Sequence, residues 1–435
     1  MPLTARRRPP PLRRVKDGDS RSPPAYCGRC IIQRSRPQRR SLGGLDGGLA
    51  ERTVIMAEIG DFSRRDAMKA VALAGVAPAM LPGAFEVLDM DKRTTRVRAP
   101  RFKVDPFWPR PLPRDPETKR FWVTGEVAGT ALDSRDRLYT INRRNLTETE
   151  LRVATPSPAF VVYDRKGEVT HSATPAVLPD GVHGCFVDHD DNVWIGGNGD
   201  AIVQKYSHDL STLLLQIGEK GRYDTDDGTI DGAPNNSSRT LLNLPADIAV
   251  DPENDEIYVA DGYGNRRVVV FDRNGTFQRQ WGEQGTLAEA QTGAPGKFFA
   301  VVHGVNIGND GLVYVNDRKG DRIQVFEKDG TFVRNIWVNR GFLLDDPASP
   351  GTSWDIAFSK DRDQRLIYCV DGEEQLLWTL NHSDGKTLGA YGQPGHMAGE
   401  FTYVHTLDTD SHGDIYTGET IGGRRVQRLE AAGRW

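Results

Sequence analysis

Short runs of β-branched and aromatic residues recur along the chain, each closed by polar turn residues. Two clear examples are Arg267 to Phe271 and Arg322 to Phe326, which are followed within a few residues by Asn-Gly and Asp-Gly respectively. Period-2 strands closed by such dipeptides are typical of β-hairpins. No long segment shows the 3.6-residue apolar period of a helical protein. We therefore expect an all-β fold.

The strand pattern is repeated six times. The copies span residues 129–144, 184–198, 247–277, 304–332, 355–372 and 406–429. A repeat of roughly 40 to 60 residues with about four strands each is typical of propeller blades. Residues 100–435 are therefore predicted to form a six-bladed β-propeller. The last copy has only three evident strands, so we expect a strand from residues 102–108 to complete it and remove two exposed edges.

Residues 1–86 lack this repeat. Residues 1–55 are rich in Pro and Arg without hydrophobic periodicity, and we expect a disordered low-complexity extension. From Met56 onward, Ser63-Arg64-Arg65 precedes a mildly apolar stretch and small residues, which resembles a twin-arginine signal over residues 56–86. An internal signal requires translation to start at Met56, so residues 1–55 would lie upstream of the true start. The alternative for this stretch is an ordinary amphipathic helix.

The apolar part of the signal, about Ala67 to Met80, is too short and alanine-rich to form a membrane span. We therefore expect export by the twin-arginine machinery to the periplasm or the extracellular space.

The net charge of −4 is unevenly distributed along the chain, because residues 1–55 contain 13 Lys and Arg against 4 Asp and Glu. The remaining residues carry 43 against 56, a net charge of −13. An acidic folded part argues against nucleic acid as a partner.

Three histidines occupy one repeat position in alternate copies. Counting back eleven residues from the second-strand aromatics Trp194, Tyr314 and Tyr416 leads to His183, His303 and His405. The other three copies have Ala128, Ala246 and Trp354 near that position. Alternate blades lie a third of a turn apart, so the three imidazoles would converge on the axis. Three neutral imidazoles with an open fourth direction are typical of a catalytic zinc site. The alternative is that they cap the inner strands and hydrogen-bond one another or water.

Two loops near the same end of the blades carry further candidate residues. Tyr263 lies in an Asp-Gly-Tyr-Gly-Asn-Arg stretch after the second strand of copy three, and Arg318 lies at the corresponding point of copy four. A tyrosine and an arginine directed at a metal could serve as a general base and its electrostatic partner, since a nearby cation favours an ionised phenol. The alternative is that each is a turn residue stacking on a neighbouring blade.

Residues 120–430 resemble the peptidyl-α-hydroxyglycine α-amidating lyases, within the wider class of NHL-repeat propellers. The most specific stretches are residues 259–283 and 295–326, with histidine motifs VHG at 182–184, VVHG at 301–304 and YVHT at 403–406. The resemblance implies that His183, His303 and His405 hold zinc. It also implies that Tyr263, Arg318 and Arg143 are catalytic, with Arg144 left open as the functional partner in place of Arg143.

The same resemblance implies a zinc-dependent carbon–nitrogen lyase that cleaves an N-acyl α-hydroxyglycine-like carbinolamide to an amide and glyoxylate. The partner would then be a small-molecule or peptide-derived substrate. The family places an aspartate after the third histidine as a calcium ligand, whereas this chain has Thr406, which puts calcium in doubt. Two alternatives stay open: a propeller hydrolase or lactonase of another substrate class, and a non-enzymatic NHL-repeat binding scaffold.

Overall fold

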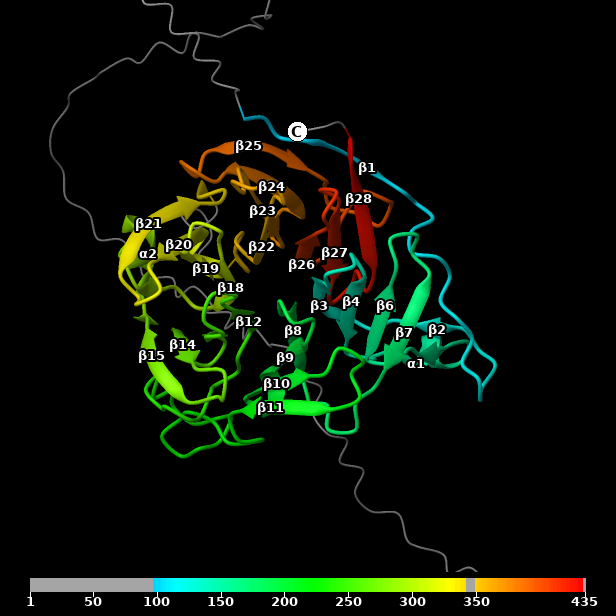
Figure 1. The fold of residues 1–435 in the computed structure, drawn as a ribbon, viewed down its shortest axis with the longest axis horizontal. Coiled ribbons are helices and arrows are strands. Elements are labelled where there is room, and N and C mark those ends of the chain that lie inside the picture. Colours follow the sequence, from blue (N-terminus) through cyan, green and yellow to red (C-terminus); the bar gives the residue numbers. More distant parts are fainter. Residues whose placement is uncertain (1–96, 342–348, 433–435) are drawn as a thin grey trace, which may run out of the picture. The chain divides into compact units, whose positions relative to one another are not determined.

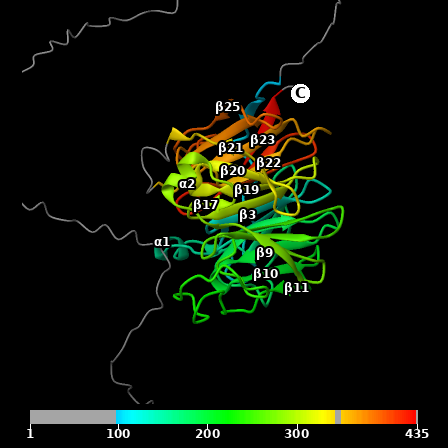
Figure 2. The ribbon, with the colours of Figure 1, turned by 90° about the vertical axis from the view of Figure 1, so that its left-hand side faces the viewer.

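The computed structural model describes residues 97–341 and 349–432. The expected extension and export signal lie outside this part of the chain. Within it, none of the helices is long and apolar enough to cross a membrane. Six four-stranded antiparallel sheets surround a common axis, as Figure 1 shows, and Figure 2 shows the same blades from the side. The predicted six-bladed all-β propeller is confirmed.

Five blades take their four strands from one continuous stretch of chain, with the first strand innermost (Figure 1). Blade 1 contains β3 (Val127–Leu132), β4 (Leu138–Asn142), β6 (Phe160–Tyr163) and β7 (Val169–Ala173). Blade 2 contains β8 (Val182–Val187), β9 (Val193–Gly197), β10 (Ile202–Tyr206) and β11 (Leu213–Ile217). Blade 3 contains β12 (Asp247–Val250), β13 (Ile257–Asp261), β14 (Arg267–Phe271) and β15 (Phe277–Trp281).

The next two blades follow the same order. Blade 4 contains β18 (Val302–Ile307), β19 (Val313–Asp317), β20 (Arg322–Phe326) and β21 (Phe332–Trp337). Blade 5 contains β22 (Asp355–Phe358), β23 (Leu366–Asp371), β24 (Leu376–Asn381) and β25 (Thr387–Tyr391).

Blade 6 is built from both ends of the described chain. Its inner strands are β26 (Val404–Thr409), β27 (Ile415–Glu419) and β28 (Val426–Ala432). The outer strand is β1 (Arg101–Val104), which pairs antiparallel with β28. A strand from the segment before the repeats therefore completes the last blade, as expected, although it ends at Val104 rather than continuing to Trp108. Asp105-Pro106 follows at once, and proline has no N–H to continue the ladder.

The loops between the blade strands contain short strands and helices. Two parallel two-stranded pairs join β2 (Trp122–Val123) to β5 (Thr155–Pro156) and β16 (Glu283–Gln284) to β17 (Lys297–Phe298). Short helices in the described residues include α1 (Glu148–Leu151) and α2 (Leu287–Thr292), each begun by a threonine capping box, and the 3₁₀ turns η1 (Asn198–Asp200) and η2 (Arg318–Gly320).

The core lies between neighbouring blades. The aromatic residue of each second strand is at most 2% exposed; these residues are Tyr139, Trp194, Tyr258, Tyr314, Tyr368 and Tyr416. Burying one large side chain of this kind contributes on the order of 2 kcal/mol. Because the same position is filled in every blade, the inner strands are held at regular angles around the axis.

Candidate metal centre

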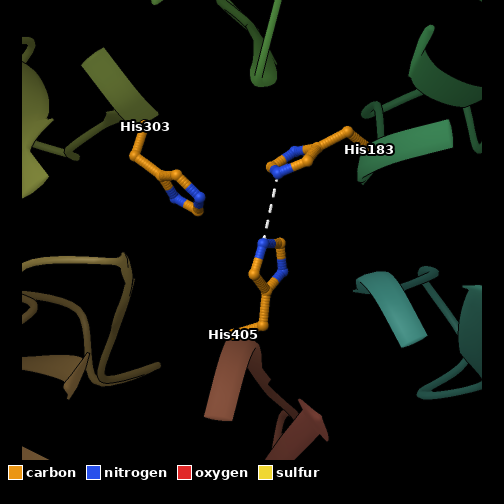
Figure 3. A group of neighbouring side chains, drawn as sticks. All are labelled: His183, His303 and His405. Atoms are coloured by element: carbon orange, nitrogen blue, oxygen red, sulfur yellow. Dashed lines mark hydrogen bonds between the residues drawn. The ribbon is translucent and has the colours of Figure 1, made fainter. Parts of the chain in front are cut away.

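The three histidines of the repeat position meet on the axis. His183 lies on β8, His303 on β18 and His405 on β26, the inner strands of blades 2, 4 and 6. Their ring centroids are 5.1, 4.7 and 5.0 Å apart, and each residue is 3 to 4% exposed. Figure 3 shows the three side chains pointing toward one another. One ring nitrogen of each lies within 4.8 Å of the others. The predicted three-histidine cluster therefore exists in the fold.

Each ligand strand carries an irregularity at its histidine. The pairing register shifts between His183 and Cys185, between Val302 and Gly304, and between Val404 and Thr406. An extra residue at such a point turns a side chain out of the regular alternation of the strand. The shift thus explains how these histidines reach the axis from strands whose other residues pack between blades.

Neighbouring blades orient two of the imidazoles. The Nδ1 atom of His183 lies 2.7 Å from the Ala246 carbonyl oxygen, and that of His303 lies 2.6 Å from the Trp354 carbonyl oxygen. A carbonyl only accepts, so each Nδ1 must carry the proton and each Nε2 presents its lone pair to the axis. Backbone acceptors of this kind fix metal-ligating histidines in many sites.

Burial keeps the imidazoles neutral. It lowers the pKa of His183 to about 3, and the charges of Arg143 and Arg318 act in the same direction. Burial likewise lowers the pKa of His303 and His405 well below the usual range, and the two arginines again add to the effect. The neutral form is the one that binds a metal, so all three imidazoles are in the form that can bind a metal at physiological pH.

The donor set fits a divalent metal such as zinc. The Nε2 atoms of His183 and His405 lie 3.2 Å apart. Two nitrogens that each lie 2.0–2.1 Å from one tetrahedral zinc ion are about 3.3 Å apart. His405 is the least constrained ligand, because its buried Nδ1 has no hydrogen-bond partner among the described residues. Three imidazole nitrogens match the ligand preference of zinc.

The structure brings the predicted tyrosine and one predicted arginine to this cluster. The Tyr263 hydroxyl lies 3.0 Å from Nε2 of His303 and 3.2 Å from Nε2 of His183. Arg318 donates from Nη1 to the same hydroxyl at 3.0 Å. Its guanidinium also lies over the Trp354 ring, 4.6 Å from the centroid. A phenol, a cation and three imidazoles therefore share one small volume, although their catalytic roles stay predictions.

The structure also distinguishes Arg143 from Arg144, because the two side chains lie in different surroundings. Arg143 donates from Nε to the Val182 carbonyl, next to His183, and forms an ion pair with Glu126 at 2.5 Å. Arg144 has a positive φ of 58° and an exposed side chain that bonds to the Ser157 carbonyl. Of the two arginines that the sequence left open, Arg143 is therefore the one at the histidine cluster.

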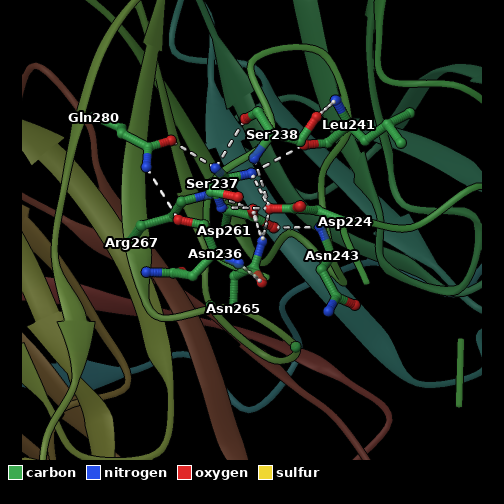
Figure 4. A network of polar contacts seen from close by, with 12 residues as sticks. Asp224, Asn236, Ser237, Ser238, Leu241, Asn243, Asp261, Asn265, Arg267 and Gln280 are labelled. Carbon is green, nitrogen blue, oxygen red and sulfur yellow. Dashed lines mark hydrogen bonds and ion pairs between the residues drawn. The ribbon is translucent and has the colours of Figure 1, made fainter. Parts of the chain in front are cut away.

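A buried polar network holds the loop that carries Tyr263 (Figure 4). Arg267 donates to Asp261 at 2.9 Å and lies 3.1 Å from Asp224, and all three side chains are at most 3% exposed. Asn265 donates to both carboxylates, at 2.8 and 3.0 Å. Because Arg267 and Asn265 both donate to these two buried carboxylates, the network anchors the loop that carries Tyr263.

The same loop is pressed against blade 4. A Cβ at Gly262 would lie 1.9 Å from the Val302 carbonyl oxygen, so only glycine allows this approach. Arg266 then closes over the loop, donating from Nη1 to the carbonyls of Gly262, Tyr263 and Asn265. The position of the tyrosine relative to His303 is thereby fixed by backbone contacts.

Three residues at the centre were given no functional role in the sequence analysis: Glu126, Arg266 and Trp354. Glu126 pairs with Arg143, and Trp354 supplies both the acceptor for His303 and the surface on which Arg318 stacks. The sequence did contain a signal for Trp354, since this residue lies near the repeat position that the histidines occupy in the other copies, which predicts a place close to the axis. Glu126 lies two residues before that position in copy one.

Thr406 occupies the position at which the resembled family has a calcium-binding aspartate. Its hydroxyl lies 3.0 Å from a carboxylate oxygen of Asp355, which blade 5 contributes. Burial raises the pKa of Asp355 to about 7, against the effect of the Leu407 N–H that it accepts. A carboxylate therefore lies beside this position, but blade 5 contributes it and not the strand of His405.

Comparison with known proteins supports the resemblance drawn from the motifs. The NHL repeat family model matches residues 242–271. Peptidyl-glycine alpha-amidating monooxygenase B of Xenopus laevis is 31% identical over 229 residues, 49% of this chain and 24% of its own length. A probable peptidyl-alpha-hydroxyglycine alpha-amidating lyase of Caenorhabditis elegans is 28% identical over 215 residues, 47% of this chain and 53% of its own.

Another relative is named for its NHL repeats and not for an enzymatic activity, and this chain covers a larger share of its length. NHL repeat-containing protein 3 of Mus musculus is 26% identical over 356 residues, 77% of this chain and 85% of its own. By contrast, the chain spans only 24 to 31% of the amidating monooxygenases of frog, rat and mouse. The similarity to amidating enzymes therefore concerns one portion of those larger proteins.

Proposed function

We propose that this chain is a zinc-dependent carbon–nitrogen lyase that cleaves an N-acyl α-hydroxyglycine-like carbinolamide to a primary amide and glyoxylate. The observation that carries the proposal is the Tyr263 hydroxyl, which lies within 3.2 Å of two converging histidine nitrogens and 3.0 Å from the Arg318 guanidinium. The names of the amidating relatives support the same reaction class.

Cleavage of the substrate requires that its hydroxyl lose a proton while its nitrogen gains one. A divalent metal, when bound, supplies a Lewis acid for the hydroxyl oxygen. Tyr263 takes the hydroxyl proton as general base, while Arg318 donates a hydrogen bond to its oxygen. The carbon–oxygen double bond then forms, the C–N electron pair goes to nitrogen, and Tyr263 returns the proton there. No proton is gained or lost overall.

Arg143 and Arg318 would also bind the carboxylate of the substrate. Arg143 and Arg318 both lie close enough to the histidines to lower the pKa of all three. Glu126 partly neutralises Arg143, which leaves an excess of positive charge at the centre. A carboxylate bound between these guanidinium groups would hold the reacting carbon over the metal and beside Tyr263.

The direct test is glyoxylate release from α-hydroxyhippurate by protein of known zinc content. We expect turnover that requires about one metal ion per chain. Absence of bound metal would favour the non-enzymatic scaffold, with which the match to NHL repeat-containing protein 3 is compatible. Bound metal with hydrolysis of lactones and no glyoxylate would favour the hydrolase alternative.

We also propose that the chain is exported by the twin-arginine route, on the strength of Arg64 and Arg65 before an alanine-rich stretch. Changing both arginines to lysine should retain the protein in the cytoplasm. Export of this double variant at the parent rate would contradict the proposal.

A further inference from the structure

The three histidines of the cluster are not oriented in the same way. His183 and His303 each donate from Nδ1 to a backbone carbonyl of the following blade. Blade 1 lies next to blade 6, and Ala128 holds the equivalent repeat position there. The buried Nδ1 of His405 nevertheless has no hydrogen-bond partner among the described residues. The orientation of His405 therefore depends on the side chains that pack against its ring.

The indole of Trp354 packs against His405. The two rings meet edge to face, with centroids 5.6 Å apart and an interplanar angle of 79°. The same indole lies 5.5 Å from the His303 ring, and Trp354 is 4% exposed. Edge-to-face packing is a favourable arrangement of two aromatic rings, so this contact can hold an imidazole that lacks a hydrogen bond.

The indole is itself held from several sides. Its Nε1 donates to the Gly351 carbonyl at 2.6 Å, and the backbone N–H of Trp354 donates to the Val370 carbonyl at 3.1 Å. Gly372 lies against the ring, since a Cβ there would be 2.3 Å from the indole Cε2. The ring can therefore act as a fixed support for what packs on it.

Arg318 also packs on this indole. The central carbon of its guanidinium lies 4.6 Å from the Trp354 ring centroid and 5.4 Å from that of Tyr263. A cation within about 6 Å of a tryptophan ring centroid is attracted by the ring electrons. The guanidinium that donates to the Tyr263 hydroxyl is thus held between two rings. One indole contacts both a candidate metal ligand and the arginine beside the candidate base.

We infer that Trp354 is a positioning residue, which sets the zinc affinity of the centre through His405 and holds Arg318 beside Tyr263. The inference rests on the proposed function for the presence of zinc and for the role of Arg318. It also gives a reason for a tryptophan in blade 5 near the repeat position at which blades 2, 4 and 6 carry histidine.

Zinc affinity, measured by calorimetric competition with a chelator, tests the inference without turnover. Trp354→Leu removes the ring but keeps the backbone carbonyl that orients His303, and zinc binding should weaken about tenfold or more. Trp354→Phe should stay within about threefold of the parent, because a phenyl ring can still pack edge to face. If the ring acts through His405, Trp354→Leu should change the affinity less than about twofold in a His405→Ala background.

Trp378→Leu is the matched control, because it makes the same substitution on β24, the third strand of the same blade. It should keep the zinc affinity of the parent. The visible absorption spectrum of bound Co²⁺ reports the geometry of its ligands, and it should change in Trp354→Leu and not in Trp378→Leu. In zinc-saturated protein, the KM for α-hydroxyhippurate should rise in Trp354→Leu alone, because Arg318 loses its support.

The inference is overturned if Trp354→Leu binds zinc as the parent does, if Trp378→Leu loses as much affinity, or if the loss persists in full without His405. Should Trp354→Leu fail to fold, Trp354→Met fills the same space without a rigid ring and carries the same expectations.

The proposed reaction can fail separately. The expected pattern of zinc affinities without glyoxylate from any variant would reject the lyase and keep Trp354 as a positioning residue for His405. Glyoxylate release by the parent, together with an unchanged zinc affinity and KM in Trp354→Leu, would reject the positioning role alone.

Discussion

Zinc binding at pH 6 should release almost no protons from the three histidines. Burial lowers the pKa of His183 to about 3 and lowers that of the other two well below the usual range. A lowered pKa of a base means that the neutral, metal-binding form already prevails above that value. At pH 6 a group with a pKa of about 3 is protonated in roughly one molecule in a thousand. Three ordinary histidines of pKa about 6.5 would together release about 2.3 protons.

Titration calorimetry in two buffers with different ionisation enthalpies measures this number directly. Tyr263→Phe is the appropriate background, because it removes the hydroxyl group that contacts Nε2 of His183 and of His303, so that only the imidazoles are measured. In that variant we expect fewer than 0.5 protons released at about pH 6, and a zinc affinity that changes little between about pH 7.5 and 5.5.

Release of two or more protons would refute the reasoning. It would mean that the imidazoles titrate as they do in water, so that the ring is open to solvent and burial does not set their charge. A zinc affinity that falls by several orders of magnitude below about pH 6.5 would lead to the same conclusion.

Three further outcomes follow from the described contacts. Tyr263→Phe should keep about one zinc per chain by metal analysis while glyoxylate release falls about a hundredfold or more, and full activity would overturn the assigned base. Arg267→Ala leaves Asp261 and Asp224 buried without their cation, so the free energy of unfolding in urea should fall by about 3–5 kcal/mol; a loss below about 1 kcal/mol would contradict this. Asp355, with a pKa raised to about 7 by burial, binds its proton more tightly in the folded state, so its contribution makes stability fall as pH rises from about 4 to 7. Asp355→Asn should flatten that profile, and unchanged slopes in urea midpoints against pH would show the carboxyl to be solvated.

Repeat geometry made much of the centre predictable from sequence. An equivalent position in alternate blades fixes both the angle and the height of a side chain, so His183, His303 and His405 could be placed together without any structure. The choice between Arg143 and Arg144 could not be made in this way. It depends on a left-handed backbone at Arg144, which residue type does not reveal for an arginine.

Side-chain contacts between neighbouring blades also could not be predicted from the sequence. The carbonyl of Trp354 orients His303, and the Trp354 ring supports Arg318, because blade 5 lies next to blade 4. The repeat pattern gives the order of blades but not which side chain crosses from one to the next. Glu126 was missed for a different reason. Its partner Arg143 lies in the same blade, seventeen residues later, directly after the strand that pairs with β3.

The make-up of blade 6 makes the three-histidine cluster one of the last features of the fold to be assembled. This blade supplies His405, and it is complete only when β28 pairs with β1 from the opposite end. His183 and His405 are 222 residues apart, so a nascent chain that stops short of blade 6 lacks the third histidine of the cluster. If the proposed zinc site is correct, zinc content would therefore report the fraction of molecules in which the ring of blades is complete.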